Sequence, residues 1–127
     1  MKIEDQVCSL ELAKKLKELG VKQESFFFWK TDQGEPYLVA HNSRFMNSKG
    51  TIEAAAFTIA EFGEILGGQF DKLPSKHFDG MWKAHAPWLP QNGELLVQAD
   101  TEADARAKML VHLIENKFIT ARSLNGM

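Results

Sequence analysis

ADTEADARAKMLVHLIENKF, residues 99–118, is the stretch that decides the fold, because it contains the start, the apolar stripe and the end of one helix. Thr101 is placed to cap the N-terminus, and Asp104 follows three residues later, where it can reach back to the cap. Apolar side chains recur at helical spacing and form one stripe: Ala103, Ala107, Leu110, Val111, Ile114 and Phe118. Such a helix needs an apolar surface to lie on, which strands earlier in the chain can supply.

Two further helices are predicted upstream of this stretch. Residues 10–19 form an amphipathic helix that Ser9 can cap and Gly20 can end. A second helix covers about 59–66 and follows a capping box at 58–61. The two positions of a hydrophobic staple around that box hold Phe57 and Phe62.

Strands are predicted from aromatic content and from alternation of apolar and polar residues. The predicted strands are 25–30, 37–40, 81–86 and 94–99, while 41–50 and 69–80 are predicted loops. Segment 51–56 stays open, because its alanines favour a helix whereas its position suits a short strand. We therefore expect a single α+β domain over 1–127. It has an antiparallel sheet of about four strands, with three helices packed mainly on one face.

The composition and charge of the chain restrict its class. It has 127 residues, 44% of them hydrophobic and 25% charged, as in an ordinary globular protein. A net charge of -2 argues against a protein whose main task is to neutralise phosphates. The single cysteine, the lack of a signal-peptide pattern and the lack of a long apolar run predict a soluble, cytoplasmic protein with no membrane partner.

Residues able to carry chemistry are few and match no catalytic pattern. Cys8 stands among apolar residues at a helix start, which favours a buried structural thiol over a nucleophile. His112 falls on the polar side of the last helix and is expected to be solvated. Residue types that bind metals gather only at Asp71, His77, Asp79 and His85, with a spacing that matches no compact ligand set. We predict no catalytic residue, no metal and no cofactor, and identify no small-molecule ligand.

The aromatic residues of the first strand raise the main functional question. Period-two geometry places Phe26 and Phe28 on one side of the strand and Phe27 and Trp29 on the other. Helices on one face can bury only one pair, so the other must meet more protein, a partner or a ligand. The candidate binding residues are Phe27, Trp29, Trp82 and Trp88. The competing interpretation is that loops 41–50 and 69–80 fold over that face.

Three stretches carry a resemblance to a known group of proteins. SLELAKKLKELGVKQESFFFW (9–29), AFTIAEFGEIL (56–66) and ADTEADARAKML (99–110) resemble small bacteriophage- and prophage-encoded proteins of gut-type bacteria, which have no known activity. The resemblance lies in caps, stripes and the aromatic strand, and it brings no catalytic residue. It implies a phage or mobile-element origin.

The predicted function is a non-enzymatic module that binds another protein or itself through the aromatic face. A nucleic-acid-associated accessory protein is the alternative, in which the aromatics stack on bases and Lys14, Lys15, Lys17 and Lys22 meet phosphates. The acidic net charge argues against it. A small metal-dependent enzyme built on the histidine and aspartate cluster is the second alternative, so the question of enzymatic activity stays open.

Overall fold

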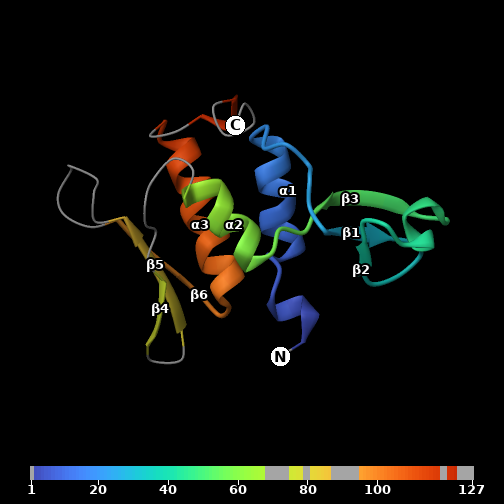
Figure 1. The fold of residues 1–127 in the computed structure, drawn as a ribbon, viewed down its shortest axis with the longest axis horizontal. Helices are drawn as coiled ribbons and strands as arrows, with labels where there is room; N and C mark the ends of the chain where they lie inside the picture. The colour runs from blue at the N-terminus through green and yellow to red at the C-terminus, as the bar shows by residue number, and fades with distance from the viewer. Residues whose placement is uncertain (1, 68–74, 79–80, 87–94, 118–119, 123–127) are drawn as a thin grey trace.

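Two three-stranded antiparallel sheets lie on either side of a group of helices in the computed structural model (Figure 1). The structure describes residues 2–67, 75–78, 81–86, 95–117 and 120–122. The first sheet has the order β2-β1-β3 and the second β4-β5-β6. The strands are β1 (Phe27–Thr31), β2 (Tyr37–Ala40), β3 (Thr51–Ala55), β4 (Ser75–Phe78), β5 (Met81–Ala86) and β6 (Leu95–Ala99). The helices are α1 (Leu10–Glu18), α2 (Ile59–Gly67) and α3 (Glu102–Glu115), with short 3-10 turns η1 (Ile3–Asp5) and η2 (Arg44–Asn47).

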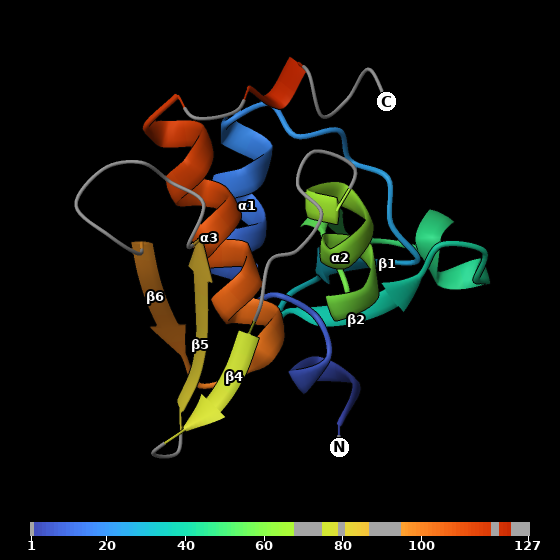
Figure 2. The same ribbon diagram turned by 60° about the vertical axis from the view of Figure 1, so that its left-hand side comes forward.

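This arrangement confirms the predicted α+β class with antiparallel strands and three helices. The expectation of one sheet covered mainly on one face is corrected, because the strands divide between two sheets and helices lie between them (Figure 2). The reason is the wide apolar surface of α3. Its predicted stripe is buried at Ala103, Ala107, Leu110 and Val111, and Ala105, Met109 and Leu113 are buried on the opposite side. A helix that is apolar on two sides needs cover on both, and α3 contacts α1, α2 and all three strands of the second sheet.

The helix starts agree with the sequence in part. Thr101 caps α3, accepting the backbone N–H of Asp104 at 3.1 Å. Ser9 occupies the cap position of α1, but its side chain makes no capping bond there, which corrects that prediction. The reason is tertiary, because the Asp104 carboxylate engages Ser9 through its backbone N–H and its hydroxyl. Gly20, with a φ of +92°, ends α1 in the left-handed conformation that favours glycine.

The capping box at the start of α2 is confirmed. The N–H of Glu61 donates to Thr58 Oγ1 at 3.1 Å, and the N–H of Thr58 donates to Glu61 Oε1 at 2.8 Å. The staple residues Phe57 and Phe62 are buried, with ring centroids 5.7 Å apart. The local sequence thus supplies both the cap and the staple at the entry to α2.

Two uncertain stretches of the chain are now assigned. The open segment 51–56 is a strand, β3, which pairs with β1 and carries a bulge that leaves Glu53 as the extra residue. The predicted loop 69–80 is corrected, because it contains β4, which pairs with β5. Asp79-Gly80, the dipeptide between β4 and β5, is a strong hairpin signal in the sequence and could have revealed this strand.

Candidate interaction surface

The aromatic residues expected to bind a partner lie in separate parts of the molecule. Phe27 and Trp29 are half-buried in β1, and the indole N–H of Trp29 donates to the carbonyl of Cys8 at 2.9 Å. Trp82 is half-buried in β5 of the other sheet, on the far side of α3 (Figure 1). Trp88 lies outside the described residues. The structure therefore does not bring Trp29 and Trp82 onto one surface.

The other side of β1 is covered by the segment 41–50. Phe28 and Lys30 are buried on that side, and Lys30 Nζ donates to the carbonyl and hydroxyl oxygens of Ser48 at 2.9 and 2.8 Å. Met46 of η2 packs against the same core. The loop-cover interpretation thus holds for 41–50, whereas 69–80 contributes β4 to the other sheet.

Two of the large apolar side chains that remain exposed belong to the β1–β2 hairpin. Phe26, immediately before β1, is 70% exposed, and Tyr37 at the start of β2 is 37% exposed. Phe26 and Phe28 therefore differ in burial although they share a side, because Phe26 lies beyond the strand and beyond its cover. Ile3 in η1, 38% exposed, completes this set within the described part of the chain.

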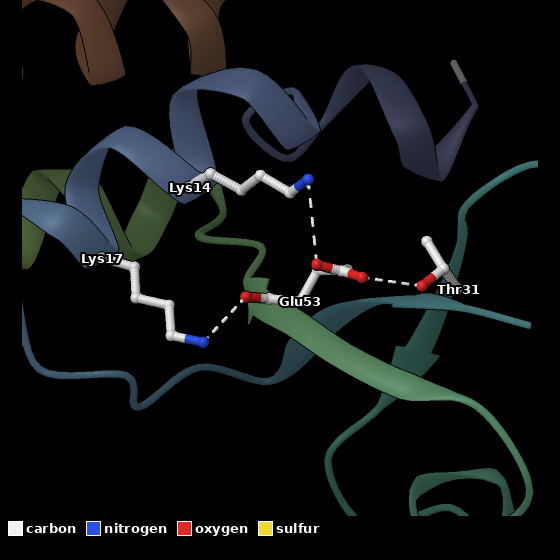
Figure 3. A network of polar contacts seen from close by, with 4 residues as sticks. All are labelled: Lys14, Lys17, Thr31 and Glu53. Atoms are coloured by element: carbon white, nitrogen blue, oxygen red, sulfur yellow. Dashed lines mark hydrogen bonds and ion pairs between the residues drawn. The ribbon is translucent and has the colours of Figure 1, made fainter.

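The outer edge of β3 is closed by side chains. Lys17 Nζ donates to the backbone carbonyl of Glu53 at 3.0 Å, and the backbone N–H of Ala55 donates to Gln23 Oε1 at 2.7 Å. The Glu53 carboxylate lies between Lys14 Nζ, 3.8 Å away, and the Thr31 hydroxyl, 2.7 Å away (Figure 3). Such capping of strand groups prevents pairing with another chain.

The outer edge of β2 is built differently. The N–H of His41 donates to the carbonyl of Phe26 at 2.7 Å, and the register pairs Phe28 with Val39 and Lys30 with Tyr37. Because antiparallel pairing alternates, the backbone groups of Tyr37 and Val39 face β1, and those of Leu38 and Ala40 face outward. The Ala40 carbonyl accepts from the N–H and hydroxyl of Ser43, whereas within the described residues no hydrogen bond reaches the outward groups of Leu38.

A cavity of about 460 Å³ opens at the start of α3, on the side of the second sheet. Its lining includes Asp5, Ile59, Trp82, Asp100, Thr101 and Glu102. The Thr101 hydroxyl already caps α3, and carboxylates at this end complement the positive end of the helix dipole. Among the described residues that line this cavity, none is a cysteine, histidine or lysine.

The residues considered for chemistry are placed as follows. Cys8 is fully buried, and this burial raises the pKa of its thiol to about 12, so the thiolate nucleophile is suppressed. His112 is half-buried rather than fully solvated. His77 pairs with Trp82 and His85 with Leu96 in the backbone register of the second sheet, while Asp71 and Asp79 lie outside the described residues. Over the part of the chain that the structure describes, no three metal-ligating side chains converge.

The lysines considered for phosphate contacts each have a partner. Lys14 faces the Glu53 carboxylate, and Lys17 donates to the Glu53 carbonyl. Lys15 forms an ion pair with Glu115 at 3.2 Å, and Lys22 forms one with Glu24 at 3.0 Å. These contacts reduce the positive field that a nucleic-acid backbone requires.

Comparison with known proteins gives no match to a family model, a curated protein or a solved structure. Among the described helices, none combines the length and the apolar character needed to cross a bilayer.

Proposed function

We propose that this protein is a non-enzymatic interaction module whose contact surface is the β1–β2 hairpin. The observation that carries the proposal is the exposure of Phe26 and Tyr37 on one hairpin whose outer edge is open. Aromatic side chains anchor protein interfaces because they give a large contact area for little loss of conformational entropy. Open strand edges supply backbone hydrogen bonds to the same partner.

The proposal places the contact surface beside the residues expected from sequence. Phe27 and Trp29 support the hairpin from within, while Phe26 and Tyr37 present its exposed apolar area. A cytoplasmic location and a phage or mobile-element origin belong to the same proposal. The origin rests on the resemblance of 9–29, 56–66 and 99–110 to phage-encoded proteins.

Site-specific photo-crosslinking tests this function. A benzophenone amino acid replaces Phe26 in the full chain, and a matched variant carries it at Glu64, an exposed position on α2. Expression in a bacterial host followed by irradiation should give a discrete adduct at position 26 and none at 64. Identical adducts at both positions, or none at position 26, would overturn the proposal.

A further inference from the structure

We infer that the partner of the β2 edge is a second copy of this chain, paired antiparallel across a two-fold axis that passes beside Leu38. This inference rests on the proposed function, because it names the partner of that surface. Pairing of the two β2 strands would join the β2-β1-β3 sheet of one copy to the same sheet of the other, giving one continuous sheet across the dimer.

The backbone groups of β2 fit this register. With Leu38 opposite Leu38 of the second copy, each outward N–H meets the outward carbonyl of the other strand. Two positions away in either direction, Ala40 lies opposite Pro36. The Ala40 N–H then donates to the Pro36 carbonyl. A bond from Pro36 back to the Ala40 carbonyl is not needed, because proline has no N–H to donate and the Ala40 carbonyl already accepts from Ser43.

The side chains fit the same register. Residues 37–40 carry no charge, so no like charges meet along the paired strands. Tyr37 comes opposite Val39 of the second copy, and both residue types are common in antiparallel strands. At each end, the exposed Glu35 comes opposite the exposed His41, an acid beside a base. Other registers lose the match between Pro36 and the occupied Ala40 carbonyl.

The two edges of the first sheet differ in a way that favours this inference. β3 is closed by Lys17 and Gln23, while on β2 the Ser43 hydroxyl caps the Ala40 carbonyl alone, the outward groups of Leu38 are left open, and no residue of the strand is charged. Edges that must stay unpaired are normally blunted by charged residues or covered. An edge left open beside a protected one is expected where pairing is the function.

Replacing Leu38 by residues of either charge tests the inference. Sedimentation equilibrium of the full-length wild type should show a dimer. Both Leu38→Lys and Leu38→Glu place like charges directly opposite each other, so each should raise the dimer dissociation constant about tenfold or more. An equimolar mixture of the two variants should restore a heterodimer. Thr51→Lys, an exposed position on the protected edge strand, is the matched control and should leave the wild-type mass unchanged.

Hydrogen exchange of the wild type gives a second readout that does not depend on a variant folding. The amides of Leu38 and Ala40 should become protected as the protein concentration rises, and the amide of Glu64 should not. A monomeric wild type, a dimer that persists in Leu38→Lys, or concentration-independent exchange at Leu38 would each overturn the inference. If the crosslink at position 26 then joins a different protein, the proposed function stands and only self-pairing fails. If no adduct forms either, both fail.

Discussion

The carboxylate of Asp104 in α3 accepts the backbone N–H of Ser9 at the start of α1, with a distance of 2.6 Å between the two atoms. The two residues are 95 positions apart, so this contact joins the first and last helices at the ends where each begins. The contact also gives a hydrogen-bond acceptor to the backbone N–H of Ser9, which has no partner within α1 itself.

Replacing Asp104 by Asn is expected to reveal the cost of burying this carboxylate. Burial raises the pKa of the Asp104 carboxyl above its ordinary 3.8, and the hydrogen bonds from Ser9 only partly oppose this shift. The folded state therefore holds the proton more tightly than the unfolded state, and the contribution of Asp104 to stability falls as pH rises through the raised pKa.

The stability of wild type should thus exceed that of Asp104→Asn by a larger margin at about pH 4 than at about pH 7. Urea unfolding of both proteins at the two pH values measures the margin. Equal margins would show that Asp104 titrates alike in the folded and unfolded states.

Glu61 connects the start of α2 to the first sheet, and its removal should destabilise the protein. Its Oε1 accepts from the Thr58 N–H and the Ser25 hydroxyl, and its Oε2 accepts from the Phe26 N–H at 3.1 Å. Glu61→Ala leaves the N–H groups of Thr58 and Phe26 without this acceptor, so we expect a loss of about 1–3 kcal/mol in the free energy of unfolding. Glu64→Ala, on the exposed face of the same helix, should change it by no more than about 0.5 kcal/mol. Similar losses in the two variants would mean that the Glu61 contacts do not hold in solution.

The features that could be predicted from sequence are those set by neighbours a few residues apart. The cap at Thr101, the box of Thr58 and Glu61 and the left-handed end at Gly20 all depend on contacts within one turn, and all are found. The burial of Cys8 follows from its apolar neighbours in the chain.

Features that depend on distant partners could not be predicted in the same way. The carboxylate of Asp104 could reach its own cap or Ser9, and only the packing of α1 on α3 selects Ser9. The burial of Lys30 depends on Ser48, which the fold brings over β1. For the candidate surface, the alternation of side chains along a strand places Phe26 and Phe27 on opposite sides. It does not show where segment 41–50 stops covering the side that carries Phe26. The open edge of β2 requires the strand order, which no local pattern encodes.

Gly50 is expected to tolerate no side chain. Its φ of +115° is one that L-residues rarely adopt, and an added Cβ would lie 2.6 Å from the carbonyl oxygen of Thr31. Gly50→Ala should lower the free energy of unfolding by about 1–3 kcal/mol. Gly34→Ala is the matched control, since an added Cβ there meets its nearest atom only at 4.0 Å. Thermal unfolding of both variants checks this, and a melting temperature unchanged in Gly50→Ala would contradict the turn geometry.

Cys8 should be inert toward alkylation in the folded protein. Burial is the main cause that raises the pKa of its thiol to about 12, and the backbone N–H of Cys8 is itself bonded to the carbonyl of Phe57 at 3.0 Å. At about pH 8, only a minute fraction of Cys8 is thiolate, and burial also excludes the reagent.

Iodoacetamide labelling followed by mass spectrometry should be slow in the native state and rapid in urea, because the thiol reacts only after the structure opens. Glu61→Ala should accelerate native labelling by about tenfold for each 1.4 kcal/mol of stability that it loses, provided opening and closing are fast relative to alkylation. Rapid labelling of the folded wild type would place Cys8 at an accessible surface and contradict its full burial.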